Sequence, residues 1–73
     1  MKETSNFYLG ACFLACGAVL EDVDYADPRH VIFKFSGNNL EDVEHQWDCK
    51  TLTINAREYA DAIREMKMKI HQK

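Results

Sequence analysis

The stretch AVLEDVDYADPRHVIFKF, residues 18–35, decides the fold class because its hydrophobic residues alternate with a period of two on both sides of a turn signal. From residue 18 to residue 25 the alternation predicts a strand with Val19, Val23 and Tyr25 on one face and Leu20, Asp22 and Asp24 on the other. Only Glu21 breaks the pattern. Asp27-Pro28 fits the first two positions of a type I turn, because proline pre-sets φ and the aspartate can accept a hydrogen bond from the turn backbone.

A second strand follows this turn and completes an antiparallel hairpin. Val31, Phe33 and Phe35 share one face, which we expect to point toward the core. Two strands are not stable alone in water, so helices must cover this aromatic face.

Helical periodicity flanks the hairpin on both sides. Before it, Thr4, Ser5 or Asn6 could open an apolar helix that ends at Cys16, and Gly17 stops it in a left-handed conformation. After it, Asn38 with Glu41 and Asn55 with Glu58 fit capping boxes for two more helices, which end near Cys49 and His71. The buried stripes of these two helices are predicted to be Leu40, Val43 and Trp47, and Tyr59, Ile63, Met66 and Ile70.

The predicted fold class is therefore α+β, a helix, β-hairpin, helix, helix order in two layers. We expect one domain over residues 1–73, with its core in 5–71 and frayed ends at 1–4 and 72–73. A chain of 73 residues supplies a core worth only about 3–5 kcal/mol, and each hairpin edge needs a cover. Both points predict a homodimer.

Composition narrows the protein class. Nothing approaches the roughly 18 uninterrupted apolar residues of a membrane span, and three cysteines are too few for a disulfide scaffold, so we expect free thiols and no membrane partner. Leu9-Gly10-Ala11-Cys12 looks like a lipoprotein cleavage site, but the apolar region before Cys12 is too short for a signal peptide. The expected location is the cytoplasm.

The chain resembles a family of small bacterial and bacteriophage domains known only as a domain of unknown function. Three segments carry the likeness: 4–17 (TSNFYLGACFLACG), 29–35 (RHVIFKF) and 52–67, which includes AREY at 56–59 and AIREMK at 62–67. The resemblance implies a short stand-alone product of a phage or mobile element, with no known activity, cofactor or catalytic residue. Cys12, Cys16 and Cys49 do not belong to the family pattern.

Cysteine and histidine spacing raises the question of a metal or a nucleophile. Cys12 with Cys16, and His45 with Cys49, are four residues apart on predicted helices, and a Cys3His set could hold zinc. Two such pairs are weak indications, because cysteine is commonly buried as a small hydrophobe. No orienting third group, phosphate loop or nucleophile elbow accompanies a thiol. We therefore predict no enzyme activity, no cofactor, no metal and no catalytic residue.

Charge is distributed unevenly along the chain. Residues 1–48 hold three Lys/Arg and nine Asp/Glu, a formal charge of −6, whereas residues 49–73 hold six and three, a formal charge of +3. The pattern is compatible with solvated, salt-bridged helix faces. It also indicates two contact surfaces: an acidic one for a basic protein (Glu41, Asp42, Glu44, Asp48) and, as the alternative, a basic one for nucleic acid (Arg64, Lys67, His71, Lys73).

The sequence thus favours a non-catalytic protein-interaction module, associated with a phage or mobile element and acting on a host protein, over a nucleic-acid-binding protein. Tryptophan and tyrosine are enriched at interface hot spots, so Trp47, Tyr8 and Tyr25 are candidate contact residues. For Trp47 we favour a main role in packing the second helix.

Overall fold

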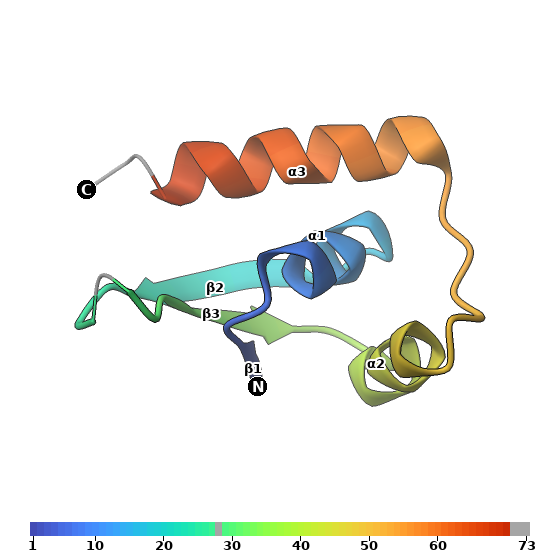
Figure 1. Cartoon of the computed structure of the whole chain (residues 1–73), viewed down its shortest axis with the longest axis horizontal. Coiled ribbons are helices and arrows are strands. Elements are labelled where there is room, and N and C mark those ends of the chain that lie inside the picture. Colours follow the sequence, from blue (N-terminus) through green and yellow to red (C-terminus); the bar gives the residue numbers. More distant parts are fainter. Residues whose placement is uncertain (28, 71–73) are drawn as a thin grey trace.

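A computed structural model describes residues 1–27 and 29–70. Its elements in chain order are β1 (Lys2–Thr4), α1 (Phe7–Ala15), β2 (Val19–Asp24), β3 (Ile32–Ser36), α2 (Leu40–Asp48) and α3 (Ala56–Ile70) (Figure 1). The predicted α+β class and the helix, hairpin, helix, helix order are confirmed, with one strand added at the start. The described part of the chain contains no helix that is both long and apolar enough to cross a membrane.

The added strand β1 turns the hairpin into a three-stranded antiparallel sheet of order β1-β3-β2. Lys2 pairs with Phe35 and Thr4 with Phe33, so β1 occupies the outer edge of β3. The prediction of a frayed start is therefore wrong for Lys2–Thr4. Three residues are too few to show a period, and their pairing depends on a strand about thirty residues away.

Strand β2 contains a bulge at the residue that broke the sequence pattern. Leu20 pairs with Phe35 and Asp22 with Lys34, which leaves Glu21 as the extra residue. The bulge moves Leu20 to the core side, where Val23 pairs with Phe33, so the predicted separation of these two residues on opposite faces is wrong.

The hairpin turn has the predicted hydrogen bonds. The His30 backbone N–H donates to the Asp27 carbonyl at 2.9 Å, and the Arg29 N–H donates to Asp27 Oδ1 at 2.9 Å. Pro28 lies outside the described residues.

Helix α1 lies between α3 and the sheet (Figure 1). Asn6 is its N-cap, since Asn6 Oδ1 accepts from the N–H groups of Tyr8 and Leu9 at 3.0 and 3.2 Å. Gly17 ends it with φ +100°, as predicted. The Phe13 ring packs edge-on against Phe35 with centroids 5.3 Å apart.

The hydrophobic core contains residues of α1, of β3 and of both other helices. Its buried hydrophobic residues are Leu9, Ala11, Cys12, Phe13, Phe33, Phe35, Leu40, Val43, Ala62 and Met66. Gly10 marks the closest approach, because a Cβ there would meet both Met66 of α3 and Phe35 of β3. Helix α1 is therefore central to the core.

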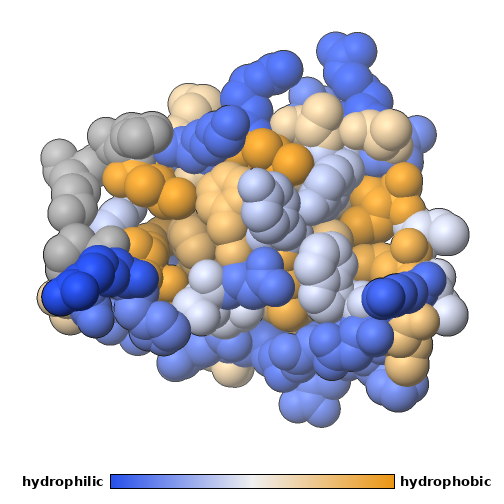
Figure 2. All heavy atoms as spheres, viewed as in Figure 1, coloured by the Kyte–Doolittle hydropathy of each residue, from blue (hydrophilic) through white to orange (hydrophobic). Residues whose placement is uncertain are grey.

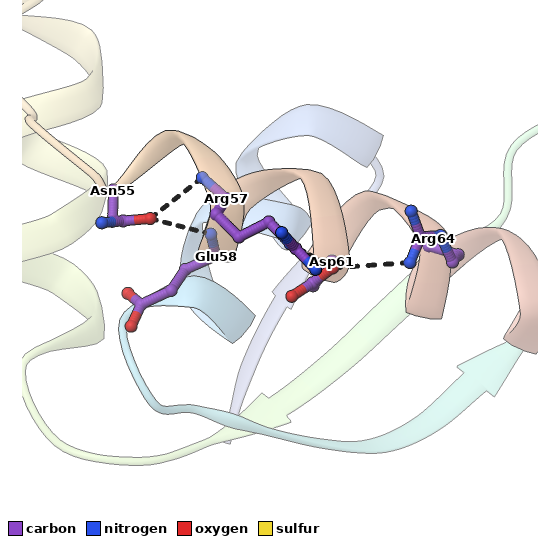
Figure 3. Close-up of polar contacts among 5 residues, drawn as sticks. All are labelled: Asn55, Arg57, Glu58, Asp61 and Arg64. Atoms are coloured by element: carbon purple, nitrogen blue, oxygen red, sulfur yellow. Dashed lines mark hydrogen bonds and ion pairs between the residues drawn. The ribbon is translucent and has the colours of Figure 1, made fainter.

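Helices α2 and α3 begin differently. Asn39 precedes α2 in a left-handed conformation, φ 64°, and makes no side-chain cap hydrogen bond, so the predicted capping box at Asn38 and Glu41 is wrong. Asn55 does cap α3: its Oδ1 accepts from the N–H groups of Arg57 and Glu58 at 2.9 and 3.1 Å (Figure 3). Helix α3 is described to Ile70, and the predicted end at His71 lies outside the described residues.

Candidate functional site

The four predicted acidic contact residues all lie on α2, but one of them, Glu44, forms an ion pair with Lys2 at the start of the chain. Lys2 Nζ of β1 lies 2.5 Å from Glu44 Oε1. The hydrogen bond to Glu44 raises the pKa of Lys2 above its ordinary value, and Glu41 and Asp48 add to this effect through their charge. Lys2 therefore offsets Glu44, and the exposed acidic surface consists of Glu41, Asp42 and Asp48.

The predicted basic surface is less uniform than its sequence indicated. Arg64 Nη1 and Arg57 Nε lie 3.5 and 3.7 Å from the same Asp61 oxygen (Figure 3). All three side chains are largely exposed, so these pairs contribute little to stability. Lys67 is exposed on α3, whereas His71 and Lys73 lie outside the described residues.

Acidic residues line a hollow on another side of α3. Glu58, Asp61 and Glu65 meet the end of α1 and the following turn in a hollow of about 390 Å³. Helix α3 therefore carries both signs of charge, which fits the solvated, salt-bridged interpretation better than a continuous phosphate-binding face.

The cysteines do not form a metal centre among the described residues, where no group of three His, Cys, Asp or Glu side chains could hold an ion. All three are free thiols: Cys12 is buried, and Cys16 and Cys49 are exposed. His45 Nε2 lies 3.7 Å from Cys49 Sγ, in line with their spacing of four residues along the chain. Burial raises the pKa of Cys12 above the ordinary thiol value, and partial desolvation by neighbouring protein atoms raises that of the exposed Cys16, which lowers the thiolate fraction that a nucleophile or a metal ligand needs.

A groove of about 720 Å³ opens where α1, α2, α3 and the connection before α3 meet. Its lining is mostly apolar and comprises Cys12, Trp47, Leu52, Ile54, Ala56 and Tyr59. Figure 2 shows apolar atoms at the surface in this part of the molecule, between α3 above and α2 below. Pockets of this size and character commonly hold ligands or the anchoring side chains of partners.

Tyr59 connects the groove to the exposed start of α1. Its hydroxyl donates to the Tyr8 carbonyl oxygen at 3.4 Å, and the Tyr8 side chain is 58% exposed. Burial raises the pKa of Tyr59, with further contributions from Cys12 and Tyr8, so the hydroxyl remains a neutral donor. Tyr25, the third aromatic candidate, lies elsewhere and donates to the Lys69 carbonyl oxygen.

Two charged residues, Asp48 and Lys50, complete the groove lining. Asp48 is the last residue of α2, and Lys50 follows the C-cap with φ 61°, the left-handed conformation. The Lys50 N–H donates to the Trp47 carbonyl at 3.1 Å, and the Thr51 N–H donates to the Gln46 carbonyl at 2.9 Å. This Schellman motif turns the chain, so that Leu52 and Ile54 face the groove.

Sequence reasoning named Trp47 as a contact candidate but missed the groove as a whole, because its walls come from four separate segments. One usable signal was present. Leu52 and Ile54 alternate with polar residues in a segment that forms neither helix nor strand, and both are half-buried.

Comparisons of the chain with family models, with curated proteins and with solved structures find no match. The resemblance to the bacterial and bacteriophage domain family stays a prediction.

Proposed function

We propose that the protein is a non-catalytic interaction module that binds a basic partner protein through the groove and the adjoining exposed side of α2. The observation that carries this proposal is that Trp47 and Asp48 both line the groove. These consecutive residues place an aromatic side chain in the groove and a carboxylate beside it. An aromatic anchor site next to complementary charge is a common arrangement in protein recognition.

Charge supports a basic partner. With Glu44 offset by Lys2, the exposed carboxylates of Glu41, Asp42 and Asp48 give this side of the molecule a negative field. The raised pKa values of Cys12 and Cys16 make these two thiols poor nucleophiles. The family resemblance supports a bacterial cytoplasmic setting, in which a phage or mobile-element product modulates a host protein.

The nucleic-acid alternative receives less support from the structure. Arg64 shares Asp61 with Arg57, and acidic residues follow another side of the same helix. Among the described members of the predicted basic surface, Lys67 remains as an exposed cation.

Self-association is a further part of the proposal. The small core and the exposed Tyr8 and Met68 side chains favour a second copy. Pairing through the β2 edge is disfavoured, because the Glu21 bulge interrupts the ladder and Asp22 adds exposed charge. Light scattering after size exclusion checks this: a dimer is expected, and a monomer at high concentration contradicts it.

The partner-binding proposal is tested by capture from bacterial lysate with matched variants. A specific partner should bind the wild-type protein and Arg64→Gln, be lost with Leu52→Ser and with Asp42→Lys, and be released by salt. Retention by both of the latter variants, with their fold checked by circular dichroism, contradicts the proposal. A gel-shift titration that shows tight nucleic-acid binding with a steep salt dependence would favour the alternative.

A further inference from the structure

We propose, as a deepening of the proposed function on which it rests, that the groove binds one bulky apolar side chain of a partner segment while Asp48 pairs with an adjacent Lys or Arg of that segment. The groove volume of about 720 Å³ leaves room for such an anchor. Trp47 and Tyr59 are both half-buried, so each offers part of an aromatic surface to an incoming side chain.

Asp48 is the last residue of α2, a position that is electrostatically unfavourable for a carboxylate. The C-terminal end of a helix carries a partial negative charge, and a carboxylate is unfavourable there. Glu41 and Asp42, in contrast, lie in the first turn of α2, where a carboxylate is favourable. A basic group from a partner would relieve the unfavourable position of Asp48.

Lys50 is a second locally unfavourable residue at the same groove. Its φ of 61° is a conformation that glycine adopts without cost and lysine does not. Proteins depart from locally favourable residues mainly at functional sites, and both departures here line one apolar groove. Together they place one anion and one cation beside the anchor, which suits a segment with a single basic residue better than a polybasic tract.

Trp47 is the single tryptophan of the chain, so its fluorescence reports directly on the groove. The experiment titrates the full-length protein with three short, end-blocked glycine–serine peptides that carry a single leucine–lysine, leucine–glutamate or serine–lysine pair. The leucine–lysine peptide should bind most tightly, shift the Trp47 emission and bind more weakly as salt is added. Equal or tighter binding of either other peptide, or no binding by any of them, overturns the inference.

Two charge variants separate a binding role from a structural one. Asp48→Asn should weaken leucine–lysine binding by about two- to fivefold and raise the melting temperature by about 1–5 °C, because it removes a misplaced charge. Glu65→Gln removes an exposed carboxylate of α3 that does not line the groove, and it should leave this affinity within about twofold. Unchanged affinity in Asp48→Asn overturns the inference.

Two further variants probe the anchor site. Ile54→Ala removes apolar lining outside the helices and should weaken binding, whereas Thr53→Ala changes an exposed residue of the same segment that does not line the groove and should not. If the peptides fail but lysate capture depends on Leu52 and Asp42, the inference is wrong and the proposed function stands. If the peptides bind as expected but lysate capture fails, the groove has the inferred specificity and the proposed function is wrong.

Discussion

Replacing Gly10 by alanine tests the closest packing in the fold. The new Cβ would lie 2.7 Å from Met66 Cε and 3.1 and 3.3 Å from two carbons of the Phe35 ring. Both neighbours are fully buried and both contact the face of α1 at Gly10, so the Met66 methyl group and the Phe35 ring must shift within the core to admit the new atom. Overpacking of this kind costs about 1–3 kcal/mol, and the better helix propensity of alanine returns about 1 kcal/mol.

The expected net loss is up to about 2 kcal/mol of the free energy of unfolding, from a total of roughly 3–5 kcal/mol for a domain of this size. The melting temperature should fall by up to about 15 °C, measured by circular dichroism, with urea unfolding as a second measurement.

Two controls separate the steric term from other causes. Gly17→Ala meets no atom within 4 Å but must adopt φ +100°, so its loss reports backbone strain alone. Met66→Ala removes the nearest atom, and Gly10→Ala should cost less in that background, with a coupling energy of about 0.5–3 kcal/mol. A stabilised Gly10→Ala protein, or an equal cost in both backgrounds, would refute the proposed packing of α1 between β3 and α3.

Three other predictions concern a turn, a cap and the thiols. Lys50→Gly should raise the free energy of unfolding by up to about 1 kcal/mol in urea titrations, since glycine adopts the left-handed turn without strain. Asn55→Ala should lower it by about 1 kcal/mol, because the α3 N–H groups lose their cap; an unchanged melting temperature would contradict this. Iodoacetamide, followed by mass spectrometry, should modify exposed Cys49 first and buried Cys12 last. Because folding raises the pKa of the Cys12 thiol, the contribution of this thiol to stability should be present below the ordinary thiol pKa. It should fall as pH rises from that value through the raised pKa of the folded protein, and Cys12→Ala should remove the effect.

Local sequence signals predicted most of the elements. Asn6, Gly17 and Asn55 act within a few residues of their own position, so helix starts and stops could be inferred from them. The alternation around Phe33 and Phe35 likewise identified β3 and its buried face. These features need no knowledge of the tertiary fold.

The errors arose where distant residues decide. Strand β1 exists because β3 offers it an edge, and the Glu21 bulge follows from the register with the same strand. Asn39 begins α2 through its backbone conformation, which a search for side-chain caps overlooks. The candidate groove combines four segments, so composition and spacing could point to Trp47 but not to its surroundings.

The position of α1 between α3 and the sheet has a consequence for folding kinetics. This most apolar helix is made early, yet it packs extensively against α3, which is made last. The hydrogen bond from the Tyr59 hydroxyl to the Tyr8 carbonyl spans 51 residues, and the pairing of Lys2 with Phe35 closes another long loop. Folding rates fall as such separations increase. We therefore expect the chain to fold in one cooperative step that is slower than that of a three-helix domain of equal length, and to aggregate readily when α3 is deleted.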